Sequence, residues 1–213
     1  MPAADAVALL EAVDLACRRG GRLLLESVAW RLDPGEALLL RGANGSGKSS
    51  LLRLLAGFMA PAGGRLLHEG RNAFADPARY RLALHHLGYQ DGLKPALTVR
   101  ENLEAAARLL GAGPERLEAA LEAFALRDLG RTPARFLSTG QRRRAALARL
   151  VAVERPIWLL DEPETGLDRR SREALLALIE RHRARGGIVL VASHGGLRLR
   201  APLVLDLDGP GPC

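Results

Sequence analysis

A glycine-rich segment near the start of the chain has the residue types of a phosphate-binding loop. The apolar run Ala37–Arg41 leads into it, and a leucine-rich stretch follows. It matches the spacing GxxxxGK[ST] and consists of Gly42, Ala43, Asn44, Gly45, Ser46, Gly47, Lys48, Ser49 and Ser50. Glycines let backbone N–H groups turn toward an anion, Lys48 can reach the outer phosphates, and Ser49 offers a hydroxyl to Mg²⁺. The segment therefore predicts a site for ATP and Mg²⁺.

A second apolar run, Ile157–Leu160, ends in two acids, Asp161 and Glu162. Ligand sites in parallel sheets lie at the carboxyl ends of the strands, so both acids are expected beside the glycine-rich loop. Asp161 suits a contact to Mg²⁺. Glu162 is then placed to polarise the attacking water as general base.

These acids belong to a wider alternation of short apolar runs and helix-period segments. Continuously apolar runs suit strands that are buried on both faces. Runs alternating with helical segments predict an α/β fold with a largely parallel sheet. Helical patterns crowd between about residues 77 and 153, which predicts a mostly helical insertion, and His85-His86 is expected on a surface helix within it.

A third motif, Leu137-Ser138-Thr139-Gly140-Gln141, opens a helical segment. Ser138 can cap that helix and Gly140 lets backbone approach an anion, although an ordinary capped helix has the same pattern. Its position in the chain, between the glycine-rich loop and the acidic strand, favours the anion-binding role over the ordinary capped helix. The set resembles the ATP-binding subunits of ABC transporters, whose signature sequence is LSGGQ.

Further segments are similar to motifs of that family, in the family's order, over about residues 10–207. Gln90 resembles the glutamine that contacts the metal and joins the catalytic core to the helical part. Thr165-Gly166-Leu167-Asp168 is similar to the D-loop, and His194 resembles the histidine that contacts the γ-phosphate. The resemblance implies catalytic roles for Glu162, His194 and Gln90.

The resemblance also implies an architecture and partners. One domain over residues 1–213 would comprise a P-loop core, a small antiparallel N-terminal sheet and a helical subdomain at about 91–153. Two copies would form an ATP-dependent homodimer that holds each ATP between the P-loop of one chain and the signature of the other. Ser138, Gly140, Gln141 and Asp168 would then bind ATP across this interface, and a separate integral membrane permease would be the third component. The helical segment after Gln90, with Leu93–Asn102, would form the groove that receives a cytoplasmic helix of this permease.

Two positions depart from the family pattern. Thr139 replaces the middle glycine of the signature and adds a side chain beside the phosphate of the second chain. The aromatic residue that stacks on adenine should fall near Cys17 by spacing, yet residues 16–20 contain none. How adenine is held is therefore open.

Composition narrows the class of protein. The formal charge is +7, but aromatic residues make up only 4%, whereas single-strand nucleic-acid binders usually interleave aromatic and basic side chains. Arg142-Arg143-Arg144 is expected on a solvated helix face, and no nucleic-acid partner is expected. No apolar stretch is long enough to span a bilayer, so a peripheral location is expected.

The subfamily is indicated by the small size and by three segments, Leu15–Arg18, Gly88–Thr98 and Glu101–Leu103. They are similar to the ATP-binding subunits of the cytochrome c maturation system, which are of the heme-exporter type. That resemblance implies energising heme handling or export from the cytoplasmic face of the inner membrane. Another small ABC exporter with a different cargo, or a soluble ABC-type ATPase acting on nucleic acid, are the alternatives.

Overall fold

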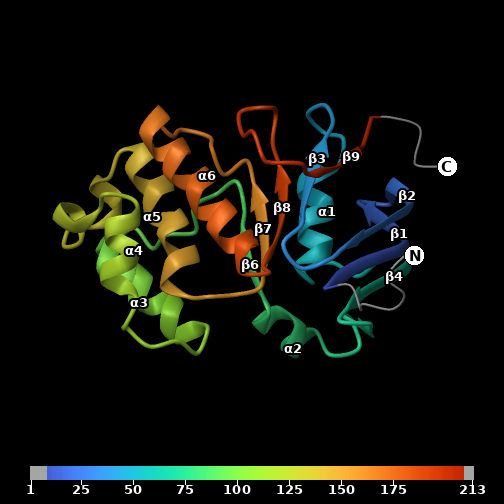
Figure 1. Cartoon of the computed structure of the whole chain (residues 1–213), viewed down its shortest axis with the longest axis horizontal. Helices are drawn as coiled ribbons and strands as arrows, with labels where there is room; N and C mark the ends of the chain where they lie inside the picture. The colour runs from blue at the N-terminus through green and yellow to red at the C-terminus, as the bar shows by residue number, and fades with distance from the viewer. Residues whose placement is uncertain (1–8, 209–213) are drawn as a thin grey trace.

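The computed structural model describes residues 9–208, whose strands form two sheets (Figure 1). The antiparallel sheet has the order β2-β1-β4-β5, formed by β1 (Leu10–Arg19), β2 (Arg22–Leu32), β4 (Gly63–His68) and β5 (Arg71–Asn72). The second sheet is parallel at every pairing and has the order β6-β7-β8-β3-β9. Its strands are β3 (Ala37–Arg41), β6 (Leu84–Leu87), β7 (Ile157–Asp161), β8 (Ile188–Ala192) and β9 (Leu203–Asp206).

Side chains of the parallel sheet alternate between two cores. In β3, Leu38 and Leu40 face one core, while Leu39 faces the other, as the period of two requires. The first core lies between the two sheets and encloses α1 (Lys48–Leu55) (Figure 1). Because both faces are covered, the central strands read as unbroken apolar runs, which is why the sequence indicates them clearly.

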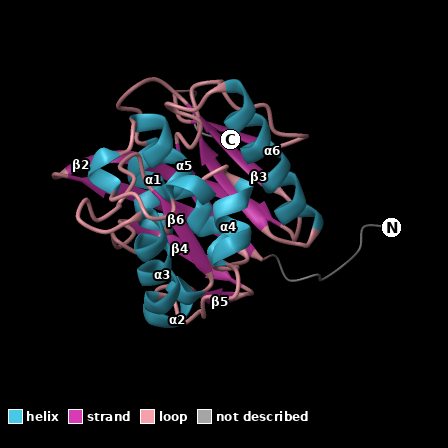
Figure 2. Ribbon diagram, turned by 90° about the vertical axis from the view of Figure 1, so that its left-hand side faces the viewer, coloured by secondary structure: helices cyan, strands magenta, loops and turns pink. Residues whose placement is uncertain are grey.

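The opposite face of the parallel sheet is covered by helices. Figure 2 looks onto the helical side of the molecule, where helices lie in front of the strands. The second core contains side chains from four of them: α3 (Val99–Leu109), α4 (Leu117–Ala123), α5 (Thr139–Ala152) and α6 (Arg169–Ala184). The remaining helical segments are α2 (Pro77–Leu82) and two 3₁₀ turns, Arg127–Leu129 and Ala134–Phe136. The predicted α/β class is confirmed.

One element differs from its prediction. His85-His86 lies in strand β6, which pairs with β7, and the expectation of a surface helix is wrong. His85 is 7% exposed, and its Nε2–H donates to the Val153 carbonyl at 2.7 Å. Two histidines interrupt the apolar pattern that would have marked a buried strand, so the pattern concealed it.

Within residues 9–208, none of the helices combines the length and the apolar character that crossing a membrane requires.

The buried His85 makes the stability of the fold depend on pH. Burial lowers the pKa of His85 to about 4, below the value of about 6.5 in an unfolded chain. Between those values only the unfolded chain binds a proton, so the free energy of unfolding must fall as pH falls from about 6.5 to 4. The contribution of this one group is roughly 3 kcal/mol.

We predict that His85→Gln, which keeps a hydrogen-bond donor and removes the titration, flattens this dependence. The measurement is urea unfolding at several pH values between 7 and 4, with wild type and variant compared at each pH. The stability difference between them should narrow or reverse toward pH 4. A difference that stays constant over this range would contradict the neutral, buried state of His85.

Candidate active site

The glycine-rich loop joins β3 to α1 and presents backbone donors. Gly47 precedes the helix with φ of +102°, a left-handed conformation that side chains disfavour. A Cβ at this position would also contact the side chain of Leu24. Among the described residues, no side chain caps the α1 N-terminus. Its first N–H groups and the positive end of the helix dipole are therefore available to an anion.

Lys48 is the first residue of α1, and its side chain folds back onto the loop that precedes the helix. Its side chain is buried, and Nζ donates to the carbonyl oxygens of Gly42 and Ala43 at 2.6 and 2.8 Å. The Ala43 N–H in turn donates to the carboxylate of Asp208, after β9. Asp208 thus fixes the start of the loop. No motif marked this residue, because its role comes from β9 pairing with β3.

The sheet register brings the acidic strand end to the same edge. Ala192 of β8 pairs with Leu40 on one side and with Asp161 on the other. Burial raises the pKa of the Asp161 carboxyl, while a hydrogen bond from the Ser49 hydroxyl acts in the opposite direction. A buried carboxylate beside a hydroxyl is a donor pair that suits a hard divalent cation.

The residues present fit Mg²⁺ in its usual manner of binding. Within residues 9–208 no group of three or more His, Cys, Asp or Glu side chains could hold a metal by itself. Mg²⁺ typically takes one or two protein ligands and completes its shell with water and phosphate oxygens. Ser49 and Asp161 are such a pair, next to a loop built for phosphate.

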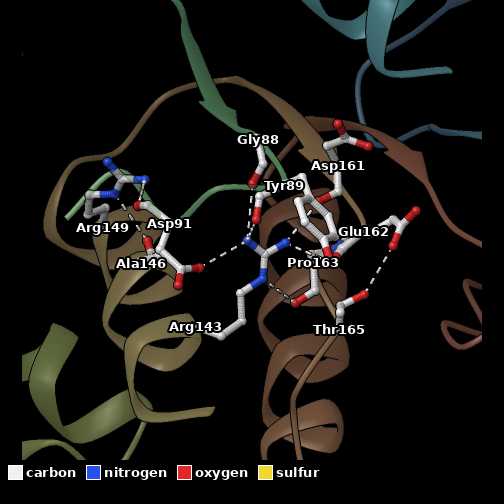
Figure 3. Close-up of polar contacts among 10 residues, drawn as sticks. All are labelled: Gly88, Tyr89, Asp91, Arg143, Ala146, Arg149, Asp161, Glu162, Pro163 and Thr165. Carbon is white, nitrogen blue, oxygen red and sulfur yellow. Dashed lines mark hydrogen bonds and ion pairs between the residues drawn. The ribbon is translucent and has the colours of Figure 1, made fainter. Parts of the chain in front are cut away.

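Glu162 is held by backbone and side-chain contacts on both sides. Its φ is +45°, which turns the chain sharply at the end of β7, and its N–H donates to the Ala192 carbonyl at 2.9 Å. The His194 Nε2 lies 3.0 Å from Glu162 Oε1. On the other side, the Thr165 hydroxyl donates to Oε2 at 3.2 Å (Figure 3). The carboxylate is therefore fixed between the chain segments that follow β7 and β8.

The glycine-rich loop, the start of α1, Glu162 and His194 line one cleft of about 520 Å³, a size typical of sites for small ligands. Its lining comprises Leu24, Asn44, Gly45, Gly47, Lys48, Ser49, Ser50, Glu162 and His194. Asp161 is not part of this lining, but it accepts a hydrogen bond from Ser49, which is. An ammonium group, hydroxyls, backbone donors, a carboxylate and an imidazole thus converge on one space. Such a set can bind a polyphosphate and accept a proton from a water beside it.

Other predicted site residues lie outside this lining. Gln90 is exposed in the loop after β6. Ser138 and Gln141 form a reciprocal capping box at the start of α5, with hydrogen bonds of 2.8 and 3.2 Å. Asp168 caps α6 by accepting from the Ser171 N–H. A single chain does not bring them to the cleft.

The motif containing Gly140 packs against the D-loop segment of the same chain. A Cβ at Gly140 would lie 2.9 Å from the Gly166 carbonyl oxygen, closer than side chains tolerate. Glycine is therefore required at this position by packing. The methyl group of Thr139, the departure from the family pattern, lies 3.6 Å from the place that a Cβ at Gly166 would occupy.

The structure corrects the position expected to face adenine. Cys17 is 1% exposed in β1, opposite Leu25, and burial raises the pKa of its thiol. Its side chain therefore faces the core and cannot stack on a base. Leu24 of β2 lines the cleft next to Gly47 instead. Spacing along the chain does not indicate which face of the hairpin a residue occupies, since neighbouring strand residues face opposite sides.

Comparison with known proteins agrees with this geometry. The family described as ABC transporter matches residues 25–165. The "Cytochrome c biogenesis ATP-binding export protein CcmA" of Rhodospirillum rubrum is 50% identical over 208 residues, which cover 98% of this chain and 89% of the relative. The protein of the same name from Pseudomonas aeruginosa is 45% identical, with 90% and 96% covered.

The chain belongs to the CcmA family of ABC transporter ATP-binding proteins. It is an ABC-type ATPase, and the prediction from the order of its motifs is confirmed. The fold agrees with solved structures. An ATP-binding subunit of an ABC transporter matches with a TM-score of 0.80 at 30% identity, covering 87% of this chain and 80% of that one. An ABC transporter ATP-binding protein from Pyrococcus furiosus matches with a TM-score of 0.81 at 25% identity, covering 93% of this chain and 97% of that one.

Proposed function

We propose that this ATPase energises a membrane transporter of cytochrome c biogenesis, acting in heme handling or export at the cytoplasmic face of the inner membrane. The observation that carries the proposal is the 50% identity, over 98% of this chain, to an ATP-binding export protein of cytochrome c biogenesis. The cleft at the strand ends supports it, because it has the groups that ATP hydrolysis needs.

ATP would bind with its phosphates on the loop amides between β3 and α1. Lys48 would exchange its two carbonyl partners for phosphate oxygens, which are stronger acceptors because they carry charge. Ser49 and Asp161 would hold Mg²⁺, which when bound neutralises part of the triphosphate charge. The low exposure of Asp161, 6%, strengthens its attraction to a cation.

Glu162 would act as general base for the attacking water. Its Oε1 lies 3.0 Å from His194 Nε2, so the imidazole can orient the carboxylate and also reach the γ-phosphate side of the cleft. Gln90 would complete the site from the loop after β6 and contact the metal. Gln90 is exposed and lies outside the cleft lining, so it would contact the metal only after the helical part moves toward the cleft.

A second copy of the chain would supply the rest of the site. Ser138, Gly140 and Gln141 lie outside the cleft of their own chain, at the positive end of α5. The positive end of a helix attracts phosphate, and Asp168 would lie at the same interface. We infer that two chains close on two ATP molecules, each between the loop of one and α5 of the other.

The membrane partner would dock in an apolar groove of about 580 Å³. Its lining includes Phe58, Leu82 and Leu109, which are 61%, 57% and 85% exposed. Large apolar side chains exposed together mark a site for a partner, and the groove suits an amphipathic helix of the permease. Residues 93–102 were the expected groove, but none of them lines it.

We predict that Glu162→Gln retains ATP binding while hydrolysis falls by about two to four orders of magnitude, the range for a lost general base. Lys48→Ala should lose ATP binding instead, since it removes the charge on the phosphates. Fluorescent-nucleotide titration measures binding, and phosphate release measures turnover. Normal hydrolysis by Glu162→Gln would refute the assigned base.

We predict that Glu162→Gln is monomeric alone and dimeric with saturating Mg²⁺ and ATP, because it binds without hydrolysing. Light scattering measures the mass. Adding Ser138→Arg should prevent association by placing bulk at the start of α5. Ser138→Ala is the matched control, because it loses the same cap, at a cost of about 1 kcal/mol, without the bulk. A protein that stays monomeric with ATP and is fully active would exclude the two-chain site.

The physiological proposal is tested by deleting the gene and staining for covalently bound heme. We expect holo-cytochrome c to disappear while apo-cytochrome synthesis continues, and wild type but not Glu162→Gln to restore it. Normal c-type cytochromes in the deletion strain would contradict the role in cytochrome c biogenesis. That result would leave the ATPase chemistry intact and indicate another small exporter.

A further inference from the structure

A buried arginine connects three segments around the candidate active site (Figure 3). Arg143 lies in the first turns of α5, shortly after the signature, and is 3% exposed. The expectation of a solvated helix face is therefore wrong for this residue. Its guanidinium donates to five carbonyl oxygens and one carboxylate, those of Gly88, Tyr89, Asp91, Asp161, Glu162 and Pro163.

One side of the guanidinium holds the end of β7. Nη2 donates to the carbonyl oxygens of Asp161 and Glu162 at 2.8 and 2.7 Å, and Nε donates to that of Pro163 at 3.2 Å. Successive carbonyls of an extended strand point in opposite directions. Here both reach one nitrogen because Glu162 has a φ of +45°. The arginine thus stabilises a conformation that a glutamate disfavours.

The other side of the guanidinium holds the loop that carries Gln90. Nη1 lies 3.1 Å from the Gly88 carbonyl oxygen, 3.4 Å from that of Tyr89 and 3.3 Å from Asp91 Oδ1. Gln90 lies between these partners in the chain. The Asp91 carbonyl accepts from Arg149, almost two turns further along α5, at 3.1 Å. The loop is therefore attached to α5 on both sides of Gln90.

The geometry requires arginine in particular. A buried charge is costly unless hydrogen bonds satisfy it, and six acceptors surround this one. The planar guanidinium directs its donors along several fixed directions, toward both loops at once. A lysine ammonium in the same place keeps the charge but donates from a single point, so it cannot hold both loops.

We propose that Arg143 is a positioning residue for ATP hydrolysis. It acts through Glu162, whose backbone it fixes, and through the loop of Gln90, which it ties to the helix that starts at the signature. A nucleotide that binds at the start of α5 would thereby affect the position of the general base, Glu162. This inference rests on the proposed role of Glu162.

The test is Arg143→Lys in the full-length ATPase. We expect kcat to fall at least tenfold while the Kd for ATP changes less than twofold, because the glycine-rich loop is not among the contacts of Arg143. The matched control is Arg144→Lys, next to it on α5. Arg144 donates to the carbonyls of Phe124 and Ala125, away from both catalytic loops, so its kcat should stay within twofold of wild type.

Two results would overturn the proposal. One is a folded Arg143→Lys with kcat within twofold of wild type. The other is an equal loss of kcat and of ATP affinity, which indicates general damage. If Arg143→Lys fails to fold, Asp91→Asn tests the proposal in its place. This variant weakens only the attachment of the Gln90 loop to Arg143. A three- to tenfold lower kcat at unchanged Kd supports the proposal, and kcat within twofold contradicts it.

Glu162→Gln measured in parallel separates this inference from the proposed function. If Glu162→Gln is inactive and Arg143→Lys is normal, the general base is supported and only the positioning role is lost. If Glu162→Gln hydrolyses ATP normally, the proposed base fails, and the inference about Arg143 fails with it.

Discussion

Parallel pairing of β3, β8 and β7 is the constraint on which the rest of the molecule depends. It places Leu40, Ala192 and Asp161 in one row at the carboxyl edge of the sheet. The three chain segments that follow must then leave from the same edge. For that reason a lysine, a glutamate and a histidine that are far apart in sequence line one cleft.

The covering of both sheet faces makes this edge rigid. Leu38 and Leu39 belong to different cores, so a shift of register by one residue would exchange the two sets of side chains. Burial on this scale holds the strand ends in place, and the loops at the edge need few further contacts. Arg143 provides the contacts that apolar packing cannot, since carbonyl groups at a strand end require donors.

The sequence predicts those parts of the site whose chemistry is local. A glycine-rich loop binds phosphate with its own backbone, and two acids at the end of an apolar run need only the strand to place them. The sequence does not reveal the environment of a residue where that environment depends on tertiary contacts. Cys17 depends on the register of a hairpin, His85 on burial beneath helices, and Arg143 on two distant loops that meet at α5.

The antiparallel sheet is a feature that the sequence indicates, whereas the location of the apolar groove is not. The order of motifs implied the N-terminal sheet by resemblance, and the structure confirms it. Residues 93–102 do not line the apolar groove, and Asn102 at the end of this segment is buried. Asn102 instead uses its amide to hold the carbonyls of Lys94, Leu97 and Thr98. An apolar pattern identifies a buried face but does not indicate which face a partner covers.

A crystal structure of Glu162→Gln with Mg²⁺ and ATP would show directly whether the strand-end cleft is the nucleotide site. We expect triphosphate density on the amides of residues 45–50, with Mg²⁺ between the Ser49 hydroxyl and the Asp161 carboxylate. Density for ATP elsewhere, such as the arginine-lined pocket beside Trp158 and His182, with none in the cleft, would contradict it.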